Sequence, residues 1–294
     1  MAMGLIALAL LGQDMLKFPP HYGGVPMTCP VGGEAFTGPS LMHYSTFGAL
    51  PDGQPIGSID FPVLMPECPG NGMIIYDKFT PENATKLAPF VASPAYKAMR
   101  DSETSYYRAH WLAKSAGNSE QAAWLLLSAT WQAKKTDPTG EQARRYNSEF
   151  VAIVRGLPAD ASSFPSIALR ARAANALREL GRFDEAEAMR ASVTMAPDAG
   201  GPEGKRNREG WGDYLARLAP PIARKDNSRE PIDIADERMA VSRCLNALDP
   251  LEGSRPLTLT AFEAEFCARE GMKPKIEKAR EARAKYRTQA KAGS

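Results

Sequence analysis

Two five-residue segments near the start of the chain constrain its fold most strongly. Residues 29–33 read Cys-Pro-Val-Gly-Gly, and residues 68–72 read Cys-Pro-Gly-Asn-Gly. A zinc knuckle reads Cys-Pro-x-Cys-Gly, because two thiolates of each knuckle bind the metal and the glycine permits a tight turn around it. Here Gly32 and Asn71 stand at the second cysteine position of each segment. Two thiolates alone do not hold a structural zinc ion, so we predict that the chain binds neither zinc nor another cofactor.

A metal site remains an alternative only if a histidine completes it together with Cys29 and Cys68. His21 and His43 are the candidates, but neither has the spacing of a knuckle ligand. A structural zinc site needs four such ligands around the ion.

The four cysteines of the chain fall into two pairs. Because the sulfur atoms of an intact four-thiolate site lie close together, loss of the metal would leave Cys29 and Cys68 near enough to form a disulfide. Cys244 and Cys267 lie on two successive expected helices, which a helical hairpin brings together. We therefore predict two disulfides and an oxidising compartment. The alternative is four ordinary buried thiols in a cytosolic protein.

The first eleven residues, Met-Ala-Met-Gly-Leu-Ile-Ala-Leu-Ala-Leu-Leu, are wholly apolar. Such a run is too short to span a membrane and long enough for the hydrophobic region of a signal peptide. No Lys or Arg precedes it, and no Ala-x-Ala cleavage site follows it. We expect residues 1–17 to be a signal or leader segment and the protein to be periplasmic. The alternative is a buried N-terminal segment in a cytoplasmic protein.

Residues 18–80 form one unit by composition. Thirteen of the 24 prolines lie in the first hundred residues, and half of the 24 glycines lie before position 73. Short runs rich in β-forming residues separate these turn formers at residues 33–36, 59–64 and 73–76. The sequence predicts a small strand-and-loop module, which contains both knuckles.

From residue 81 onward the apolar residues recur at spacings of three and four, as in amphipathic helices. The expected helices cover residues 104–115, 119–134, 140–155, 164–180 and 184–193. Short connections between helices of similar length favour antiparallel neighbours. The predicted fold class is therefore α+β, mainly α, with a helical region at residues 81–195. A linker or exposed loop at 196–210, C-terminal helices at 211–272 and a basic tail at 273–294 complete the expected organisation.

One segment of the helical region is more specific. Residues 171–193 contain Leu-Gly-Arg-Phe-Asp-Glu-Ala at a turn, with small residues before it. This segment resembles a tetratricopeptide repeat, in which Ala174 and Ala186 would allow close helix packing and Gly181 and Phe183 would form the turn. No second clean copy follows at the expected period, so we expect divergent tetratricopeptide-like helical hairpins rather than a regular solenoid.

The order of these parts resembles that of an uncharacterised bacterial family. Its members join an N-terminal zinc-ribbon or rubredoxin-like module, with two Cys-Pro-x-Cys-Gly knuckles, to tetratricopeptide-like helices. The resemblance covers about residues 25–195 and rests on residues 29–33, 68–72 and 180–186. Gly32 and Asn71 depart from the pattern at ligand positions, so the zinc that the resemblance implies is not carried over. The resemblance implies an architecture and no activity.

Charge is distributed unevenly along the chain. Residues 1–104 carry five Lys/Arg and nine Asp/Glu, whereas residues 273–291 carry eight basic and two acidic side chains. A basic tail could contact nucleic acid or an anionic lipid. We prefer a solvated, frayed last helix, because only Ile276 and Tyr286 give it large apolar side chains. We predict no nucleic-acid partner and no stable membrane span.

We find no catalytic motif: the sequence lacks a nucleophile elbow, a His-Glu-x-x-His pair and a Walker loop. Tyr107, His110 and Trp111 share one face of an expected helix, which either lines a ligand groove or packs in the core. An enzyme or small-ligand site would lie at the junction of the β module and the first helices, near His43, Tyr44 and these residues.

Arginine is frequent on the expected middle helices, as at Arg172. On the concave face of helical hairpins such side chains bind carboxylates of a partner, and on an outer face they are solvated. We predict a non-catalytic protein–protein interaction module with Arg172 among the partner-surface residues. The alternative is an enzyme or small-ligand binder at the junction described above.

Overall fold

The computed structural model describes residues 18–251, 253–254 and 257–292, so the expected leader at residues 1–17 lies outside it. Two antiparallel β-hairpins come first. The strands β1 (Tyr22–Thr28) and β2 (Ala35–Leu41) pair from Tyr22–Leu41 to Thr28–Ala35. The shorter strands β3 (Thr46–Ala49) and β4 (Pro55–Gly57) form the second hairpin, with an irregular register after Thr46.

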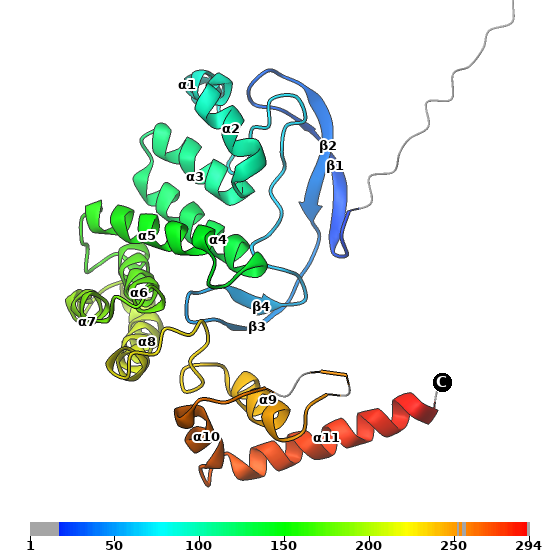
Figure 1. Cartoon of the computed structure of the whole chain (residues 1–294). Helices are drawn as coiled ribbons and strands as arrows, with labels where there is room; N and C mark the ends of the chain where they lie inside the picture. The colour runs from blue at the N-terminus through cyan, green and yellow to red at the C-terminus, as the bar shows by residue number, and fades with distance from the viewer. Residues whose placement is uncertain (1–17, 252, 255–256, 293–294) are drawn as a thin grey trace, which may run out of the picture.

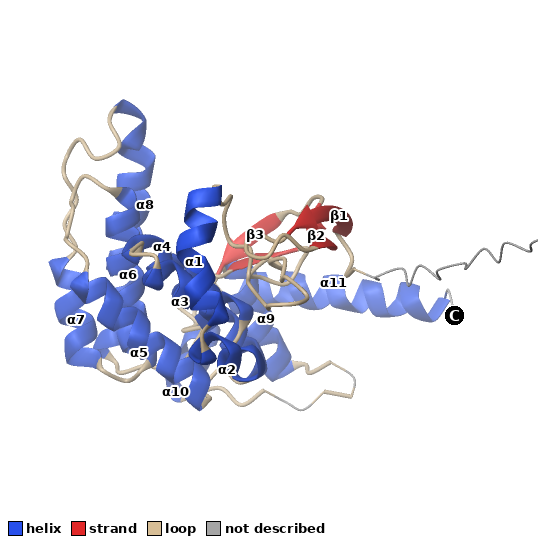
Figure 2. Cartoon of the chain, turned by 90° about the horizontal axis from the view of Figure 1, so that it is seen from above, coloured by secondary structure: helices blue, strands red, loops and turns tan. Residues whose placement is uncertain are grey.

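Helices make up most of the remaining described chain. They are α1 (Pro81–Ala92), α2 (Pro94–Ser102), α3 (Ser105–Ser115), α4 (Ser119–Thr136), α5 (Glu141–Gly156), α6 (Phe164–Glu179), α7 (Phe183–Ser192), α8 (Lys205–Ala223), α9 (Glu237–Leu248), α10 (Ala261–Ala268) and α11 (Lys273–Ala292). Figure 1 shows α1–α8 following one another along an arc, with both hairpins on its inner side. In Figure 2 the strands lie beside these helices rather than between them. The structure confirms the prediction of an α+β fold that is mainly α.

Most helices begin at a residue whose side chain accepts a hydrogen bond from the first turn, which stabilises a helix by about 1 kcal/mol relative to alanine. These N-caps are Thr80, Ser93, Thr104, Asn118, Ser163, Asp236 and Thr260. Helices α3–α7 correspond to the helices expected at 104–115, 119–134, 140–155, 164–180 and 184–193. Their bounds were predictable because capping residues and glycines mark the helix ends in the sequence.

The α3–α4 and α6–α7 hairpins share one turn geometry. A glycine with positive φ ends the first helix of each, at Gly117 (φ 84°) and Gly181 (φ 77°). In both, the residue after the glycine donates its N–H to the carbonyl five residues earlier, and the glycine donates to the carbonyl three residues earlier. This is the Schellman arrangement. The repeat-like turn at Gly181 therefore has a structural counterpart at Gly117, where the surrounding sequence differs.

The strand predictions were largely wrong. Of the three expected strands only residues 33–36 overlap a real one, β2, while residues 59–64 form a loop and Ile74 makes one isolated bridge to Glu67. Pro62 interrupts residues 59–64 and has no N–H to donate to a sheet. Strand β1 contains Gly23, Gly24 and Pro26, which are poor β-formers, so its pairing depends on the hairpin partner rather than on propensity.

The described core divides into one large and two small apolar clusters. The large cluster is built from α3–α8 and includes Leu126, Phe150 and Leu177. The second joins the knuckles to α1–α3 and contains Cys29 and Cys68, and the third joins α9, α10 and α11 and contains Cys244 and Cys267. Each small cluster thus holds one cysteine pair and the large cluster holds none. Small cores bury too little apolar surface to be stable without such cross-links.

The chain beyond residue 195 is more ordered than expected. A short 3-10 turn at Pro202–Gly204 leads directly into α8 at Lys205, so the second part of the expected linker is helical. The basic tail forms α11, which packs on α9 through Ile276 and donates from Arg283 to the Asp249 carbonyl and to Asn246. It is therefore anchored along α9 rather than frayed throughout.

Candidate functional site

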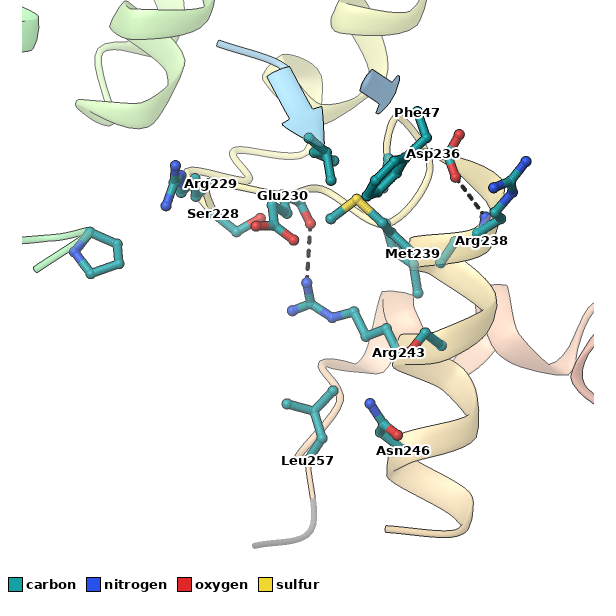
Figure 3. Close-up of a pocket in the computed structure, with 16 residues that line it drawn as sticks. Phe47, Ser228, Arg229, Glu230, Asp236, Arg238, Met239, Arg243, Asn246 and Leu257 are labelled. Carbon is teal, nitrogen blue, oxygen red and sulfur yellow. Dashed lines mark hydrogen bonds between the residues drawn. The ribbon is translucent and has the colours of Figure 1, made fainter. Parts of the chain in front are cut away.

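A groove of about 700 Å³ lies between the β3–β4 hairpin and α9. The hairpin contributes Phe47 and Ile56, and α9 contributes Met239. In Figure 3 the side chains of Phe47 and Met239 lie between Arg229 on one side and Arg238 on the other. Phe47 is 56% exposed, which is unusual for so large an apolar side chain. The groove therefore has an apolar middle and a guanidinium group at each end.

The charged groups of the groove are not all neutralised by neighbours. Arg243 lies 2.7 Å from a carboxylate oxygen of Glu263 and donates to the Glu230 carbonyl. Arg229 instead donates to the side-chain carbonyl of Gln54. Within the described residues, neither Arg229 nor Arg238 has a carboxylate within salt-bridge distance, so both remain available to an anionic group.

The hairpin wall of the groove is fixed by a buried ion pair at its turn. Lys134 of α4 places its Nζ 2.8 Å from Asp52 Oδ2 and 2.6 Å from Glu179 Oε2. The side chains of Lys134 and Asp52 are 1% and 3% exposed. A buried charge without a partner costs several kcal/mol, so this contact fixes the position of the turn between β3 and β4.

The carbonyl of Pro51, next to Asp52, is held as well. Arg172 Nη1 donates a hydrogen bond to this carbonyl at 2.6 Å, and the Tyr214 hydroxyl donates a second one at 2.7 Å. The Arg172 guanidinium lies 4.5 Å from the centre of the Tyr214 ring, within cation–π range. Gly53 has a positive φ of 89°, and a Cβ there would come within 2.8 Å of Arg172 Nε, so this close approach requires glycine.

The opposite wall, residues 226–236 leading into α9, is fixed by Arg178. This side chain is 0% exposed, and its Nη1 donates to the carbonyls of Asp226 at 2.6 Å and Ser228 at 2.8 Å. Arg229, which lines the groove, follows immediately. Arg224 adds a second anchor through its salt bridge of 2.6 Å to Asp233.

Both walls are thus held by two adjacent residues, Arg178 and Glu179, at the C-terminal end of α6. Asn175, one turn earlier, links them, because its Oδ1 accepts from Arg178 and its Nδ2 donates to Glu179 at 2.8 Å. The chain before α9 also contacts the hairpin turn directly, because Arg229 donates to the side-chain carbonyl of Gln54. The width of the groove is therefore set by α6 together with this contact.

The protonation states of the buried pair follow from opposing effects. Burial raises the pKa of Asp52, but the charge and hydrogen bond of Lys134 outweigh it, so the pKa lies below the ordinary 3.8. Burial alone would lower the pKa of Lys134. The negative charges and hydrogen bonds of Asp52 and Glu179 outweigh this effect, so the pKa of Lys134 lies above 10.5. A carboxyl group whose pKa is lowered on folding stabilises the fold at pH values above its unfolded-state pKa. An amine whose pKa is raised on folding stabilises the fold at pH values below its unfolded-state pKa. Both members of the pair are therefore charged at neutral pH.

The expected aromatic face of α3 packs in the protein. His110 is 3% exposed, and its Nδ1 donates to the Ala122 carbonyl of α4 at 2.8 Å. Burial lowers the pKa of His110 below 6.5. Tyr107 stacks on Tyr146, with ring centres 4.5 Å apart. Trp111 packs in the small cluster next to the knuckles. The packing interpretation of this face is the correct one.

The structure does not bring the expected junction residues together. His43 lies against His21, with ring centres 5.0 Å apart, and Tyr44 lies against Phe61 at 5.5 Å. A groove of about 610 Å³ does exist between the β module and α4, and His21 and Phe61 line it. His43, Tyr44, His110 and Trp111 line neither this groove nor the one beside α9. The junction hypothesis therefore lacks its proposed residues.

Arg172, the expected partner-surface residue, donates a hydrogen bond to the chain's own Pro51 carbonyl. No sequence pattern distinguishes Lys134 from Lys135, although Lys134 is buried in the structure and Lys135 is exposed. The groove was not predictable from the sequence either, because its two walls are far apart along the chain. The Gln54–Arg229 contact, for example, joins residues 175 positions apart.

The two knuckles have the same backbone geometry and face each other across a disulfide. In each, the final glycine donates to the cysteine carbonyl, at 3.2 Å for Gly33 and 2.9 Å for Gly72. The Cα atoms of Cys29 and Cys68 are 5.6 Å apart, with the sulfur atoms bonded. Asn71 donates to the Val31 carbonyl at 2.7 Å and so ties the two Cys-Pro segments together.

Residues that would hold a metal are accordingly not assembled around Cys29. His21 and His43 lie at the opposite end of the β1–β2 hairpin, roughly 20 Å away along a seven-residue strand. No group of three or more His, Cys, Asp or Glu suited to a metal ion occurs among the residues that the structure covers.

The second disulfide supports the groove itself. Cys244 of α9 bonds Cys267 of α10, with Cα atoms 5.5 Å apart, and both lie in the small C-terminal core. Met239 and Arg243, which line the groove, lie on the same helix. The cross-link therefore fixes the helix that forms one wall.

None of the helices in the described ranges has the length and apolar character that crossing a membrane demands.

No protein family matches this chain, and neither a curated protein nor a solved structure matches it.

Proposed function

We propose that this protein is a non-catalytic protein-interaction module of an oxidising compartment, the periplasm, and that a segment of its partner binds between the β3–β4 hairpin and α9. The divergent tetratricopeptide-like helices act as the frame that holds the two walls apart. The β module closes the inner side of that frame.

The observation that carries this proposal is the exposed apolar surface of the groove. Phe47 and Met239 meet there, and Leu257, 40% exposed, lies along the same groove. Leu248, the last residue of α9, and Leu251 are also exposed. Contiguous exposed apolar surface with a polar rim is typical of interaction sites on otherwise water-facing proteins.

The chain's own β module already occupies part of the inner face of the helical arc. Lys134 forms an ion pair with Asp52 of the same chain, and Arg172 and Tyr214 both donate hydrogen bonds to the Pro51 carbonyl. These are the kinds of contact that a helical array makes with a bound peptide elsewhere. A partner of this protein therefore uses the groove beside α9, where Arg229 and Arg238 have no carboxylate partner among the described residues.

The chemistry of the groove supports binding rather than catalysis. Its lining side chains in the described chain include Ser228 and Ser242 but no histidine or cysteine that could act as a base or a thiol nucleophile. The compartment is supported by the two cysteine pairs, since such cross-links persist in oxidising surroundings.

Site-specific photo-crosslinking tests the proposal. A photoreactive p-benzoylphenylalanine at position 239 is expected to give a discrete crosslinked species in the native periplasm, and the same group at exposed Lys97 on α2 is expected to give none. Replacement of Phe47 by Asp in the protein that carries the crosslinker at 239 should abolish the product. Equal products from both positions, or turnover of a small substrate that a groove substitution abolishes, would contradict the proposal.

A further inference from the structure

A second groove runs along the other side of α9. It lies between α9 and α11, has a volume of about 660 Å³ and is lined at its base by Val241, Leu245, Ala279 and Ala282. Figure 1 shows α11 lying along α9 and continuing beyond it. Apolar side chains at the base and basic side chains along the rim give this groove the same character as the first.

The two grooves meet on α9. Arg238 and Ser242, one turn apart on that helix, line both of them. Arg238 is exposed, and no carboxylate in the described residues lies within salt-bridge distance of it. A ligand that fills both grooves therefore crosses α9 at Arg238.

Positive charge dominates the second groove. Arg238, Lys275, Lys278 and Arg283 line it, with Glu237 as the acidic residue among its lining side chains. Lys275 lies close to Glu237 and is neutralised by it, and Arg283 donates to Asn246. This leaves Arg238 and Lys278 facing the groove without a carboxylate in the described chain. With Arg229 in the first groove, three cationic groups follow one another across α9.

We propose that the ligand of these joined grooves is an extended acidic protein segment that crosses α9 at Arg238, with apolar side chains seated in each groove. This inference rests on the proposed function. A helix with its side chains is about 10–12 Å wide and an extended chain advances about 3.3–3.6 Å per residue, so about three residues span α9 between the grooves. The carboxylates pair with Arg229, Arg238 and Lys278, and the bidentate geometry of arginine favours carboxylate at the first two.

A protein segment fits better than a nucleic acid. Glu230, Asp236 and Glu237 also line the two grooves. The regularly spaced phosphates of a polynucleotide cannot avoid these carboxylates, whereas a protein segment can place uncharged side chains opposite them and its own carboxylates opposite the arginines. The apolar bases of the grooves match leucine-like side chains, whereas exposed aromatic platforms for base stacking are limited to Phe47 in their lining.

Fluorescence anisotropy with a defined probe tests this inference. The probe is a labelled peptide of about twelve residues in which glutamate and leucine alternate. The matched peptides carry lysine for glutamate or serine for leucine, and an oligodeoxynucleotide of equal charge is the nucleic-acid probe. We expect only the glutamate–leucine peptide to bind. Its affinity should fall about tenfold or more when the ionic strength rises from 0.05 to 0.5 M, because exposed charge pairs are screened.

Charge reversals locate the segment on the protein. Arg229→Glu, Arg238→Glu and Lys278→Glu are each expected to weaken binding about tenfold, with the largest loss for Arg238→Glu because it serves both grooves. Lys97→Glu, which changes charge equally on exposed α2, should leave the affinity unchanged. Circular dichroism spectra that match the parent protein establish that each variant is folded.

The outcomes separate this inference from the proposed function. Binding of the lysine peptide or the oligonucleotide as tight as that of the acidic peptide would overturn the inference, as would an equal effect of Lys97→Glu. If the crosslink at position 239 forms under those circumstances, the interaction function stands and only the acidic character of the partner is wrong. If no crosslink forms at 239 but one forms at 97, the proposed function itself fails.

Discussion

Lys134 of α4 and Asp52 of the β3–β4 turn form an ion pair of 2.8 Å in which neither side chain is more than 3% exposed. The two residues are 82 positions apart. Their contact joins the N-terminal β module to the helical arc, and Glu179 extends it to α6. The pair thereby fixes one wall of the groove beside α9.

Removal of Lys134 should be strongly destabilising. Lys134→Met leaves Asp52 and Glu179 buried without a cation, and we expect the free energy of unfolding in urea to fall by about 3–5 kcal/mol. The neighbouring Lys135→Met is the matched control, because Lys135 and Asp60 are exposed and such pairs contribute about 0–1 kcal/mol. Equal stability of the two variants would show that the buried pair does not fix the turn.

Arg178 should control the second wall without contacting any ligand. In Arg178→Met the carbonyls of Asp226 and Ser228 lose their donor, so residues 226–236 should exchange amide hydrogens faster than in the parent protein. Arg182→Met, at the start of α7, is the control, because it removes a more exposed pair with Glu185 and should leave exchange in 226–236 unchanged. Unchanged exchange in both variants would remove Arg178 as the anchor of this wall.

Acid should destabilise the protein through His110. Burial lowers its pKa below 6.5, so the folded state binds fewer protons than the unfolded state near that pH. The free energy of unfolding should therefore fall as the pH drops from 7 to 5. In His110→Gln, which keeps a donor for the Ala122 carbonyl, this decrease should be smaller. An identical pH dependence in both proteins would assign it to other groups.

The two cysteine pairs should contribute differently to stability and to binding. From loop lengths of 39 and 23 residues, loss of Cys29–Cys68 should cost about 4 kcal/mol and loss of Cys244–Cys267 about 3.5 kcal/mol in the chain-entropy description. The double serine variant at 244 and 267 should also weaken peptide binding, because α9 forms a groove wall, whereas the variant at 29 and 68 should not. Non-reducing peptide mapping of the native protein should show both cross-links, and four free thiols would contradict the periplasmic assignment.

Local sequence signals predicted local structure well. The helices α3–α7 are marked by caps and glycines, and the knuckles by their Cys-Pro pattern, because these features act within a few residues. The predicted pairing of Cys29 with Cys68 is confirmed. The prediction came from the likeness of the two Cys-Pro segments to zinc knuckles, whose ligands lie close together.

Features that depend on distant contacts were not predictable. Lys134 and Lys135 are neighbours of the same type, yet the fold buries one and exposes the other. Arg172 reads as a partner-binding residue until the turn at Pro51 is known to occupy it. Phe47 and Met239 form one groove only because Arg178 and Glu179 place their two segments side by side. Such contacts depend on the whole fold and leave no periodic or local pattern.

Competition for the photo-crosslink at position 239 tests the central claim most directly, because it addresses the site and the chemistry of its ligand together. In the native periplasmic mixture, an excess of the unlabelled glutamate–leucine peptide should suppress the crosslinked species, and the matched lysine peptide should leave it intact. A crosslink at 239 that neither peptide reduces would contradict the assignment of the groove beside α9 as the binding site of an acidic partner segment.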